Sequence, residues 1–462
     1  MTGYDRIVEA DAEEECRAWI RKLIDAKDEV VAFVDARLNG GGAGTYKGFF
    51  KGSFNLSYHI DFGDRRPSVL IRFAMPGESV TPWRAEKVAN EVRFIEYLRE
   101  NTSIPLPHIH CWGSVEESPQ QLGPFIIMDF VRGTRLSTFL RRPTDDEYEA
   151  AILNPDLNEA TLDKVYEQIA DYMLQMSCLA FSRIGAISKD DGESGTWTVT
   201  GRPLTFDMNI LATSTGYPVD QFHTAPLDLA SDFFELVARQ HLLHLDTQRN
   251  LADDEADAQR RFVARQRFKQ LIPKYCTDNA GPFKIFCDDM QPSNMLIDPD
   301  TLRITAMLDF EFTNSMPAQF AYDPPWWLLL RGPGIWIEDD GMDDFLASYV
   351  PRMEQFLRAL ERVEAKSSLV RGGGPAEELR LSTRMRDSWR TGCFWFNYAA
   401  RRCLDVDVIY WEALHDHEDG DGLSLLDPAT RAEAGRLVRT KMEQLSAYEA
   451  ECATRFPEES SK

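Results

Sequence analysis

The sequence of 462 residues predicts an α+β protein of two lobes, a small lobe with an antiparallel sheet and one long helix and a large, mostly helical lobe. Three strand-like apolar runs, at 46–50, 56–62 and 68–73, follow one another across short turns. A segment with helical periodicity comes next, at 83–100. Beyond residue 130 the apolar spacing is mostly helical, and a hydrophobic content of 43% supports a large buried core.

The predicted boundaries define three parts: a helical N-terminal extension at 1–44, the small lobe at 45–130 and the helical large lobe at 131–462. Helical periodicity over 7–38 predicts the extension. Apolar residues at helical spacing over 162–181 predict a core helix of the large lobe. Asp427 and Pro428 form a favourable N-cap and first-turn pair, so we expect a final helix to begin there.

The most informative segment is FKIFCDDMQPSNMLIDPDT at 283–301, followed by LDF at 308–310. It places Asp289 after an apolar strand, Asn294 five residues later, and Asp309 after a predicted hairpin. This is the layout of a phosphoryl-transfer site of the protein-kinase type. There the first Asp accepts the proton of the substrate hydroxyl, and the Asn and the second Asp hold magnesium. A surface hairpin in which these residues only cap turns is the alternative.

A candidate phosphate-binding loop lies between the first two predicted strands. Its sequence is KGSFN, and we expect Gly52, Ser53 and Asn55 to approach the nucleotide phosphates. It has one glycine rather than a full G-x-G-x-x-G, so an ordinary hairpin turn is the alternative.

A pair of opposite charges is predicted between the third strand and the long helix. Glu91 lies on the apolar face of the helix, where a carboxylate needs a cation or hydrogen-bond donors. Arg72, in the strand VLIRF, is the candidate partner. A kinase uses such a pair to hold the α- and β-phosphates. A solvated Glu91 at the edge of the apolar face is the alternative.

Together these segments resemble the aminoglycoside phosphotransferase and choline kinase-like family, in its divergent fungal form. The resemblance is carried by KGSFN, VLIRF, the Glu91 helix, IIMDFVRGTRL, CDDMQPSN, LDFEF, DPPWWLLL and SWRTGCFWFNYAARR, and it extends from about residue 46 to 411. It implies the protein-kinase-like fold, ATP and Mg²⁺ as cofactors, and a small-molecule hydroxyl acceptor. It also implies that Asp129 and Phe130 lie in the linker between the lobes, where backbone groups would bind adenine.

Two departures from the family pattern leave a second hypothesis open. Cys287 stands where the family usually has His, and Arg72 stands where kinases normally have Lys. The leading hypothesis is an ATP-dependent small-molecule kinase. The alternative is a pseudokinase that binds nucleotide or acts as a scaffold without turnover. A protein kinase is the least favoured, because no long activation segment with an A-P-E motif follows Asp309.

The sequence leaves the acceptor open, from aminoglycosides and choline-like alcohols to sugars and secondary metabolites. By analogy with the family, we expect its pocket to be walled by the large lobe, from 140–282 and from the region after Trp326. A pocket with several carboxylates would favour a cationic acceptor. A pocket lined by aromatic side chains would favour a more apolar one.

Composition limits the partners and the compartment. With 75 acidic and 51 basic residues the net charge is −24, which argues against nucleic acid and anionic membranes as main partners. The eight cysteines form no C-x-x-C motif, which favours a reducing compartment. The N-terminus has no apolar signal region, and no apolar run reaches the ~18 residues that span a bilayer. We therefore expect a cytoplasmic protein.

Overall fold

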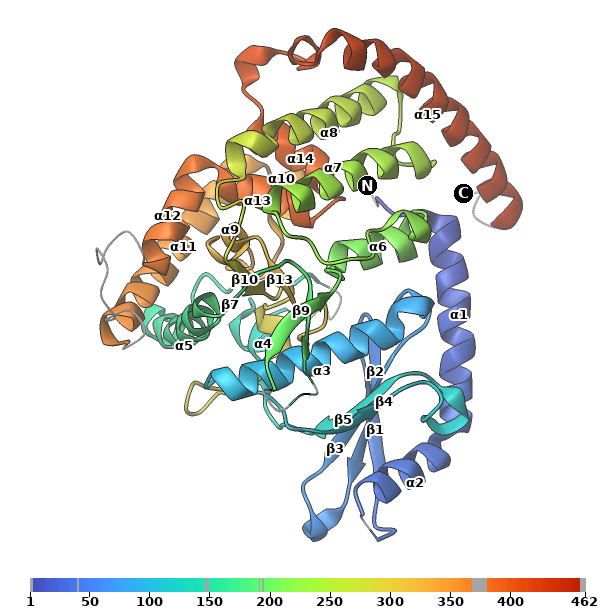
Figure 1. Ribbon diagram of the computed structural model, residues 1–462, viewed down its shortest axis with the longest axis vertical. Helices are drawn as coiled ribbons and strands as arrows, with labels where there is room; N and C mark the ends of the chain where they lie inside the picture. Colours follow the sequence, from blue (N-terminus) through green and yellow to red (C-terminus); the bar gives the residue numbers. More distant parts are fainter. Residues whose placement is uncertain are drawn as a thin grey trace.

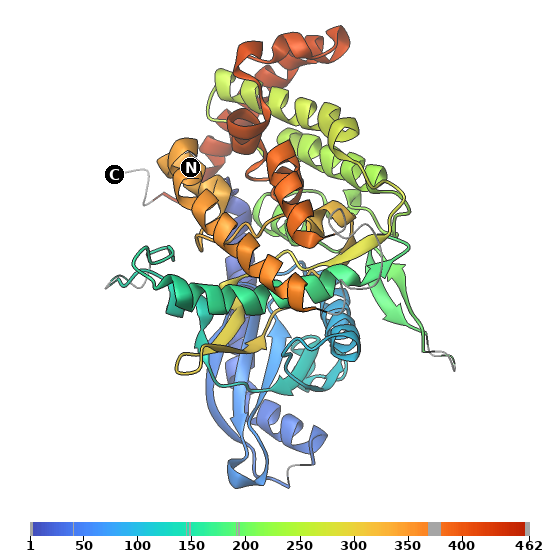
Figure 2. The ribbon, with the colours of Figure 1, turned by 90° about the vertical axis from the view of Figure 1, so that its left-hand side faces the viewer.

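The computed structural model describes residues 3–39, 41–144, 146, 149–190, 192, 195–367 and 380–457. It has the two predicted lobes, with a sheet in the small lobe and helices making up most of the large lobe (Figure 1). The view turned by 90° shows the same division, with the sheet at the opposite end of the molecule from the last helix (Figure 2).

The small lobe contains a five-stranded antiparallel sheet in the order β1-β2-β3-β5-β4. Its strands are β1 (Thr45–Lys51), β2 (Asn55–Asp61), β3 (Val69–Ala74), β4 (Ile109–Gly113) and β5 (Phe125–Asp129). Alternate side chains of a strand point to opposite faces. Ile71 and Phe73 therefore pack on one face, while Arg72 points towards the long helix α3 (Arg84–Asn101), where its partner Glu91 lies.

The predicted N-terminal helix is divided into α1 (Arg6–Asp25) and α2 (Lys27–Arg37) at Ala26. Both helices bury their apolar side chains against the sheet, on the face away from α3. The start of α1 reaches the large lobe, where the Asp5 amide donates to the Ser214 carbonyl at 2.8 Å. Helix α1 therefore runs along both lobes, as Figure 1 shows.

The large lobe is built around helices. Its helices of eight or more residues are α5 (Glu159–Cys178), α6 (Phe206–Ser214), α7 (Ala230–Thr247), α8 (Glu255–Tyr275), α10 (Pro333–Asp340), α11 (Met342–Lys366), α12 (Leu381–Thr391), α13 (Cys393–Arg401) and α15 (Pro428–Arg455). Among the described residues of this lobe, three α-helices are shorter: α4 (Leu136–Leu140), α9 (Ala318–Ala321) and α14 (Val406–Ile409). As predicted, α15 begins at Asp427, whose carboxylate accepts from the amides of Ala429 and Thr430.

Short strands in the large lobe carry the predicted catalytic segment. They are β6 (Thr134–Arg135), β7 (Ala180–Phe181), β8 (Ala186–Lys189), β9 (Trp197–Gly201), β10 (Phe283–Phe286), β11 (Met295–Asp298), β12 (Arg303–Met307) and β13 (Asn314–Met316). Strands β11 and β12 form the hairpin expected between Asn294 and Asp309. Strand β10, which leads into the catalytic loop, lies between β13 and β7.

A hydrophobic cluster with residues from both lobes lies between them. It includes Val80 and Trp83 of the small lobe and Met208 and Phe312 of the large lobe. Phe54, at the tip of the β1–β2 hairpin, packs against the same cluster. The hairpin tip is thereby fixed close to the segment that follows Asp309.

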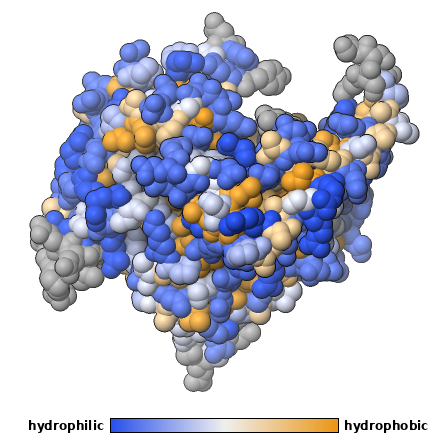
Figure 3. All heavy atoms as spheres, turned by 90° about the horizontal axis from the view of Figure 1, so that it is seen from above, coloured by the Kyte–Doolittle hydropathy of each residue, from blue (hydrophilic) through white to orange (hydrophobic). Residues whose placement is uncertain are grey.

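The face of the large lobe in Figure 3 is mostly hydrophilic, with apolar side chains gathered near its middle. All eight cysteines are free thiols, in agreement with their spacing in the sequence. Among the described helices, none combines the length and the apolar composition needed to cross a bilayer.

Candidate active site

The catalytic loop connects β10 to β11 and brings Asp289 next to Asn294. The Asn294 side-chain amide donates to the Asp289 carboxylate at 2.7 Å and to the Asp289 carbonyl at 2.9 Å. Gln291 donates a further hydrogen bond to the same carboxylate. Because Asn294 donates through its nitrogen, its side-chain oxygen is left available for another ligand.

Burial raises the pKa of Asp289 to about 7, against the lowering effects of Arg402 and of the hydrogen bonds from Asn294 and Gln291. A carboxylate with a pKa near neutral pH is well matched to general-base catalysis. The predicted role of Asp289 as the base therefore has a suitable electrostatic environment.

Asp309 is held beside this loop by the hairpin. The amide of Leu308 donates to the Asn294 carbonyl at 2.8 Å, and the Cys287 thiol lies 3.9 Å from the Asp309 carbonyl as its hydrogen-bond donor. Asp309 itself has a φ of 55°, a left-handed conformation that Asp tolerates better than most residues. The Cys287 thiol thus connects the catalytic loop to the Asp309 backbone. This hydrogen bond explains why a buried hydrogen-bond donor stands at position 287.

The predicted contact between Arg72 and Glu91 is confirmed. Arg72 pairs with Glu91 through one guanidinium nitrogen and with Asp309 through the other. Both Arg72 and Glu91 are buried. The guanidinium fork thus connects the small-lobe helix to the catalytic segment of the large lobe, through two separate nitrogens whose planar geometry a lysine ammonium would not reproduce. A role of this pair in phosphate binding stays a prediction.

A second buried ion pair, which the sequence interpretation missed, lies next to the first. Lys87, one helical turn before Glu91, pairs with Glu311, and their side chains are 3% and 5% exposed. Asn55 completes the group, donating to Glu311 at 2.7 Å and accepting from Lys87 at 3.1 Å. Burial opposes ionisation of Glu311, but Lys87 and Arg72 outweigh it and lower the pKa. The second carboxylate of LDFEF was the signal that could have revealed it.

Asp288 is a further residue without a predicted role. It accepts from Arg401 at 2.7 Å and also pairs with Arg402. Both arginines follow the aromatic run of α13, so two ion pairs at the end of this helix hold the catalytic loop in place. The two adjacent arginines of the AARR sequence at 399–402 were the signal for buried ion pairs, but nothing in that sequence indicates Asp288 as their partner.

The other predicted nucleotide-binding residues lie in the small lobe and in the linker. Gly52 closes the β1–β2 turn by donating its amide to the Asn55 carbonyl at 2.8 Å, and Gly52 and Ser53 are both exposed. The Asn55 side chain is occupied by Glu311 and Lys87, as described above. The phosphate-binding roles of Gly52, Ser53 and Asn55 stay predictions.

Asp129 and Phe130 lie at the end of β5, where the chain leaves the small lobe. The Asp129 amide donates to the His108 carbonyl at 2.9 Å and the Phe130 amide to the Ser68 carbonyl at 3.0 Å. The Phe130 ring stacks on His59, with ring centroids 3.9 Å apart. Both amides already donate to carbonyls within the protein. An adenine base bound here would therefore have to pair with other backbone groups of the linker.

The residues present fit a magnesium ion. Mg²⁺ prefers oxygen ligands and is usually bound by one or two carboxylates together with substrate phosphates. Asp309 and the Asn294 side-chain oxygen supply such donors. Burial raises the pKa of Asp309, as does nearby Glu311, despite the opposing effect of Arg72, so this carboxylate would gain from an added cation. Within the described residues, no three His, Cys, Asp or Glu side chains form a metal-binding group, so phosphate oxygens would have to complete the set.

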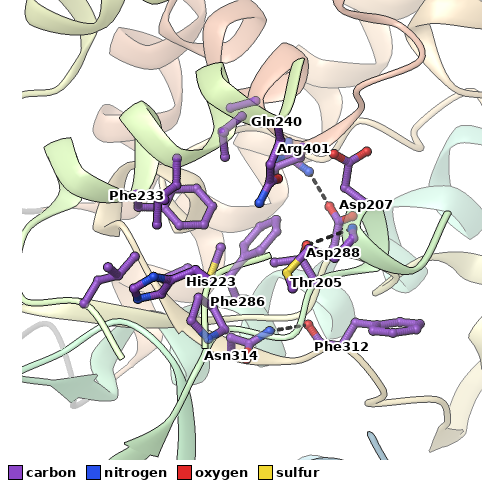
Figure 4. Close-up of a pocket in the computed structure, with 17 residues that line it drawn as sticks. Thr205, Asp207, His223, Phe233, Gln240, Phe286, Asp288, Phe312, Asn314 and Arg401 are labelled. Carbon is purple, nitrogen blue, oxygen red and sulfur yellow. Dashed lines mark hydrogen bonds and ion pairs between the residues drawn. The ribbon is translucent and has the colours of Figure 1, made fainter. Parts of the chain in front are cut away.

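Two cavities flank the catalytic loop, and both lie in the large lobe. The first, of about 610 Å³, is lined by residues of α6, α7, β13 and the end of α13 (Figure 4). The second, of about 530 Å³, is lined by residues of α5 and the DPPWW segment. Phe286, Asp288 and Arg401 form the wall that they share. Both cavities lie in the region where the acceptor pocket was expected.

A model of the phosphotransferase enzyme family matches residues 45–365 of this chain. The chain belongs to that family. The match begins at β1 and contains every predicted site residue of this phosphotransferase-family protein, from Gly52 to Asp309.

Among curated proteins, the chain is similar to the clavilactone A biosynthesis cluster protein Y of Ampulloclitocybe clavipes. The two are 23% identical over 287 residues, which cover 59% of this chain and 62% of that protein. The chain therefore spans less than two thirds of the length of that relative.

Two of the solved structures that are similar to this chain have low sequence identity to it. An aminoglycoside phosphotransferase in a ternary complex with AMP-PNP and hygromycin B is 13% identical, with coverage of 89% of this chain and 98% of that chain and a TM-score of 0.42. The ethanolamine kinase of Plasmodium vivax is 12% identical, with coverage of 89% and 82% and a TM-score of 0.43.

Proposed function

We propose that this protein is an ATP- and Mg²⁺-dependent kinase that transfers the γ-phosphate to a hydroxyl group of a small molecule. The observation that carries the proposal is the convergence of Asp289, Asn294 and Asp309 on one loop and hairpin, with Arg72 reaching Asp309 from the small lobe. Family membership supports the same class of reaction.

Each residue has a definite task in this proposal. Asp289 accepts the proton of the acceptor hydroxyl, since burial keeps its pKa close to the working pH. Asn294 orients the Asp289 carboxylate and, with Asp309, would hold magnesium. The metal, when bound, neutralises charge on the phosphates. Arg72 would contact the phosphates while Glu91 keeps it in place.

A pseudokinase remains the second candidate, and one observation favours it. Arg72 pairs directly with Asp309, so a cation of the protein already occupies the carboxylate that would bind magnesium. Nucleotide binding with productive metal would require this pair to open. A protein in which it stays closed would bind nucleotide weakly or without turnover.

The test is a thermal-shift titration with ATP and Mg²⁺, followed by an assay for phosphate transfer to a panel of small hydroxyl compounds. The kinase proposal expects Mg²⁺-dependent stabilisation by ATP and transfer that Asp289→Asn abolishes. Stabilisation by nucleotide without transfer to any compound would favour the pseudokinase. Absence of any effect of ATP with or without Mg²⁺ would contradict the kinase and the nucleotide-binding pseudokinase, and would leave a scaffold that binds no nucleotide.

A further inference from the structure

The first cavity, lined by residues of α6, α7 and β13, lies beside both the catalytic loop and the tip of the phosphate-loop hairpin. Asp288, which lines it, immediately precedes the proposed base Asp289. Phe312, which also lines it, packs edge-on against Phe54 at the tip of the phosphate-loop hairpin, with ring centroids 5.6 Å apart. The cavity therefore lies beside the loop that carries the proposed base and beside the aromatic contact that fixes the tip of the phosphate-loop hairpin.

The second cavity lacks the contact with the hairpin tip. Its lining comes from α5, β10, the catalytic loop, residues 320–327 and Arg401, and it includes neither Phe312 nor Phe206, the two rings that pack against Phe54. It lies on the other side of the wall that contains Phe286 and Asp288. The contact with the phosphate-loop hairpin thus favours the first cavity as the acceptor site.

The wall of the first cavity is predominantly apolar. Helix α7 contributes one continuous face at helical spacing, and Met208, Leu227 and Met316 complete much of the surface. The face of α7 consists of Phe233, Leu236, Val237 and Gln240. Figure 4 shows Phe233 and Gln240 on this helix, facing Phe286 and Arg401 across the space.

The carboxyl groups that line the cavity have cationic or hydrogen-bonding partners within the protein. Asp288 is neutralised by Arg401 and Arg402. Asp207 accepts the Cys403 amide at 2.8 Å, and burial raises the pKa of its carboxyl, which favours the neutral form. Little uncompensated negative charge is left to attract a cationic ligand.

Polar atoms without partners mark where a ligand could be held. His223 Nε2, Asn314 Oδ1 and Arg401 Nε are buried and have no hydrogen-bond partner among the described residues. Asn314 and Arg401 are 1% and 6% exposed, and all three residues line this cavity. Buried polar atoms are nearly always paired, with protein groups or with ordered water, so these three atoms are the hydrogen-bonding groups that the protein leaves to water or to a ligand beside this cavity.

We propose that this cavity is the acceptor site of the phosphotransferase and that it takes an uncharged, largely apolar molecule that carries a hydroxyl group. Apolar side chains of α7 and β13 bind the body of this acceptor. His223, Asn314 and Arg401 supply the hydrogen-bonding groups for its polar atoms, and Asp288 places the wall of the cavity next to Asp289 in the chain. This inference rests on the proposed kinase function for the transfer step, but binding in the cavity can be measured without it.

A matched pair of fluorescent probes tests the inference on the full chain. The neutral probe is 2-(2-naphthyl)ethanol, and the cationic probe is 2-amino-3-(2-naphthyl)propan-1-ol, which has the same ring system. Binding is followed by naphthyl fluorescence without ATP. We expect the neutral probe to bind at least tenfold more tightly than the cationic one. Tighter binding of the cationic probe would overturn the proposal.

A substitution inside the cavity locates the binding. Val237→Phe fills space on the lining face of α7 and should weaken binding of the neutral probe at least tenfold, without changing the thermal shift caused by ATP and Mg²⁺. Arg239→Phe, on the exposed face of the same helix, is the matched control and should bind as wild type. Unchanged binding in a folded Val237→Phe variant would overturn the proposal.

A second variant covers the case in which Val237→Phe does not fold. Gln240→Phe introduces the ring about one turn along the same face and carries the same expectation. A transfer assay with both probes then separates this inference from the proposed function. Cavity-dependent binding of the neutral probe without phosphate transfer would contradict the kinase and leave the binding site standing. Transfer to the cationic probe alone would contradict the acceptor class and support the kinase.

Discussion

Arg72 and Asp309 form an ion pair that connects the small lobe to the proposed metal site. The same guanidinium also pairs with Glu91 on α3, so one side chain holds two carboxylates from different lobes. Kinases usually have Lys at this strand position. The two nitrogens of the arginine fork explain how this chain bridges both carboxylates. As a result, the Asp309 carboxylate that magnesium would need is already paired with the Arg72 guanidinium.

The first prediction concerns this bridge. Arg72→Lys keeps one positive charge but removes the bidentate fork, so it should retain the contact with Glu91 and release Asp309. The Mg²⁺ concentration that gives half-maximal stabilisation by ATP should then fall severalfold. Thermal shift against Mg²⁺ at fixed ATP measures it. Arg303→Lys, exposed on β12, is the control and should behave as wild type. A higher Mg²⁺ requirement in Arg72→Lys would mean that the arginine assists metal binding.

The second prediction concerns the pH dependence of transfer. Asp289 can accept a proton only when it is ionised, and burial raises its pKa to about 7 in the free protein. The value of kcat/KM should therefore fall about tenfold per pH unit below that pKa and level off above it. Asp289→Asn should lower the rate by about 10²–10⁴-fold and abolish this pH dependence. A profile that is flat from about pH 5.5 upward would exclude Asp289 as the titrating base.

Residues brought together by local spacing could be predicted from the sequence. Asp289, Asn294 and Asp309 lie on one loop and one hairpin, so their separation along the chain fixes their approach in space. The pairing of Arg72 with Glu91 followed from an unexplained carboxylate on an apolar helix face and a lone cation in an apolar strand.

Contacts that depend on the packing of distant segments could not be predicted. Asp288 and Arg401 are 113 residues apart, and nothing near either one indicates the other. The pair of Lys87 and Glu311 depends on how α3 meets the segment after β12, which is decided by the contact between the lobes. The break at Ala26 was missed because no Gly or Pro marks it.

The third prediction concerns the phosphate loop. A β-carbon on Gly52 would meet only the Asn55 carbonyl oxygen, at 3.6 Å, so the fold does not require glycine here. Gly52→Ala should change the free energy of unfolding by no more than about 1 kcal/mol. It should nevertheless weaken ATP binding severalfold, because the added methyl group would obstruct the approach of the phosphates.

Urea unfolding and ATP titration of the same Gly52→Ala preparation give both quantities. Gly435→Ala, in α15, is the matched control, since its β-carbon would have only the Arg439 side chain nearby, at 3.8 Å. This control should not change ATP binding. Wild-type ATP affinity in Gly52→Ala would remove the phosphate-loop role from this glycine.

The fourth prediction concerns the buried pair of Lys87 and Glu311. Glu311→Gln would leave the Lys87 ammonium buried without a counter-charge, at a cost of about 3–5 kcal/mol in the free energy of unfolding. Replacing both residues by apolar ones, as in Lys87→Met with Glu311→Leu, should recover most of that loss, because the desolvation penalty of both ions disappears with the pair. Urea unfolding measures each variant.

The exposed pair of Arg390 and Asp387 supplies the control for this cycle. Its side chains are 73% and 55% exposed, so Asp387→Asn should change stability by less than about 1 kcal/mol. Catalysis gives a second measurement. If the pair aligns α3 with the segment carrying Asp309, the double variant should regain stability but not wild-type kcat/KM, since Asn55 and the Arg72 network lose a neighbour. Full recovery of both quantities would assign the pair to stability alone.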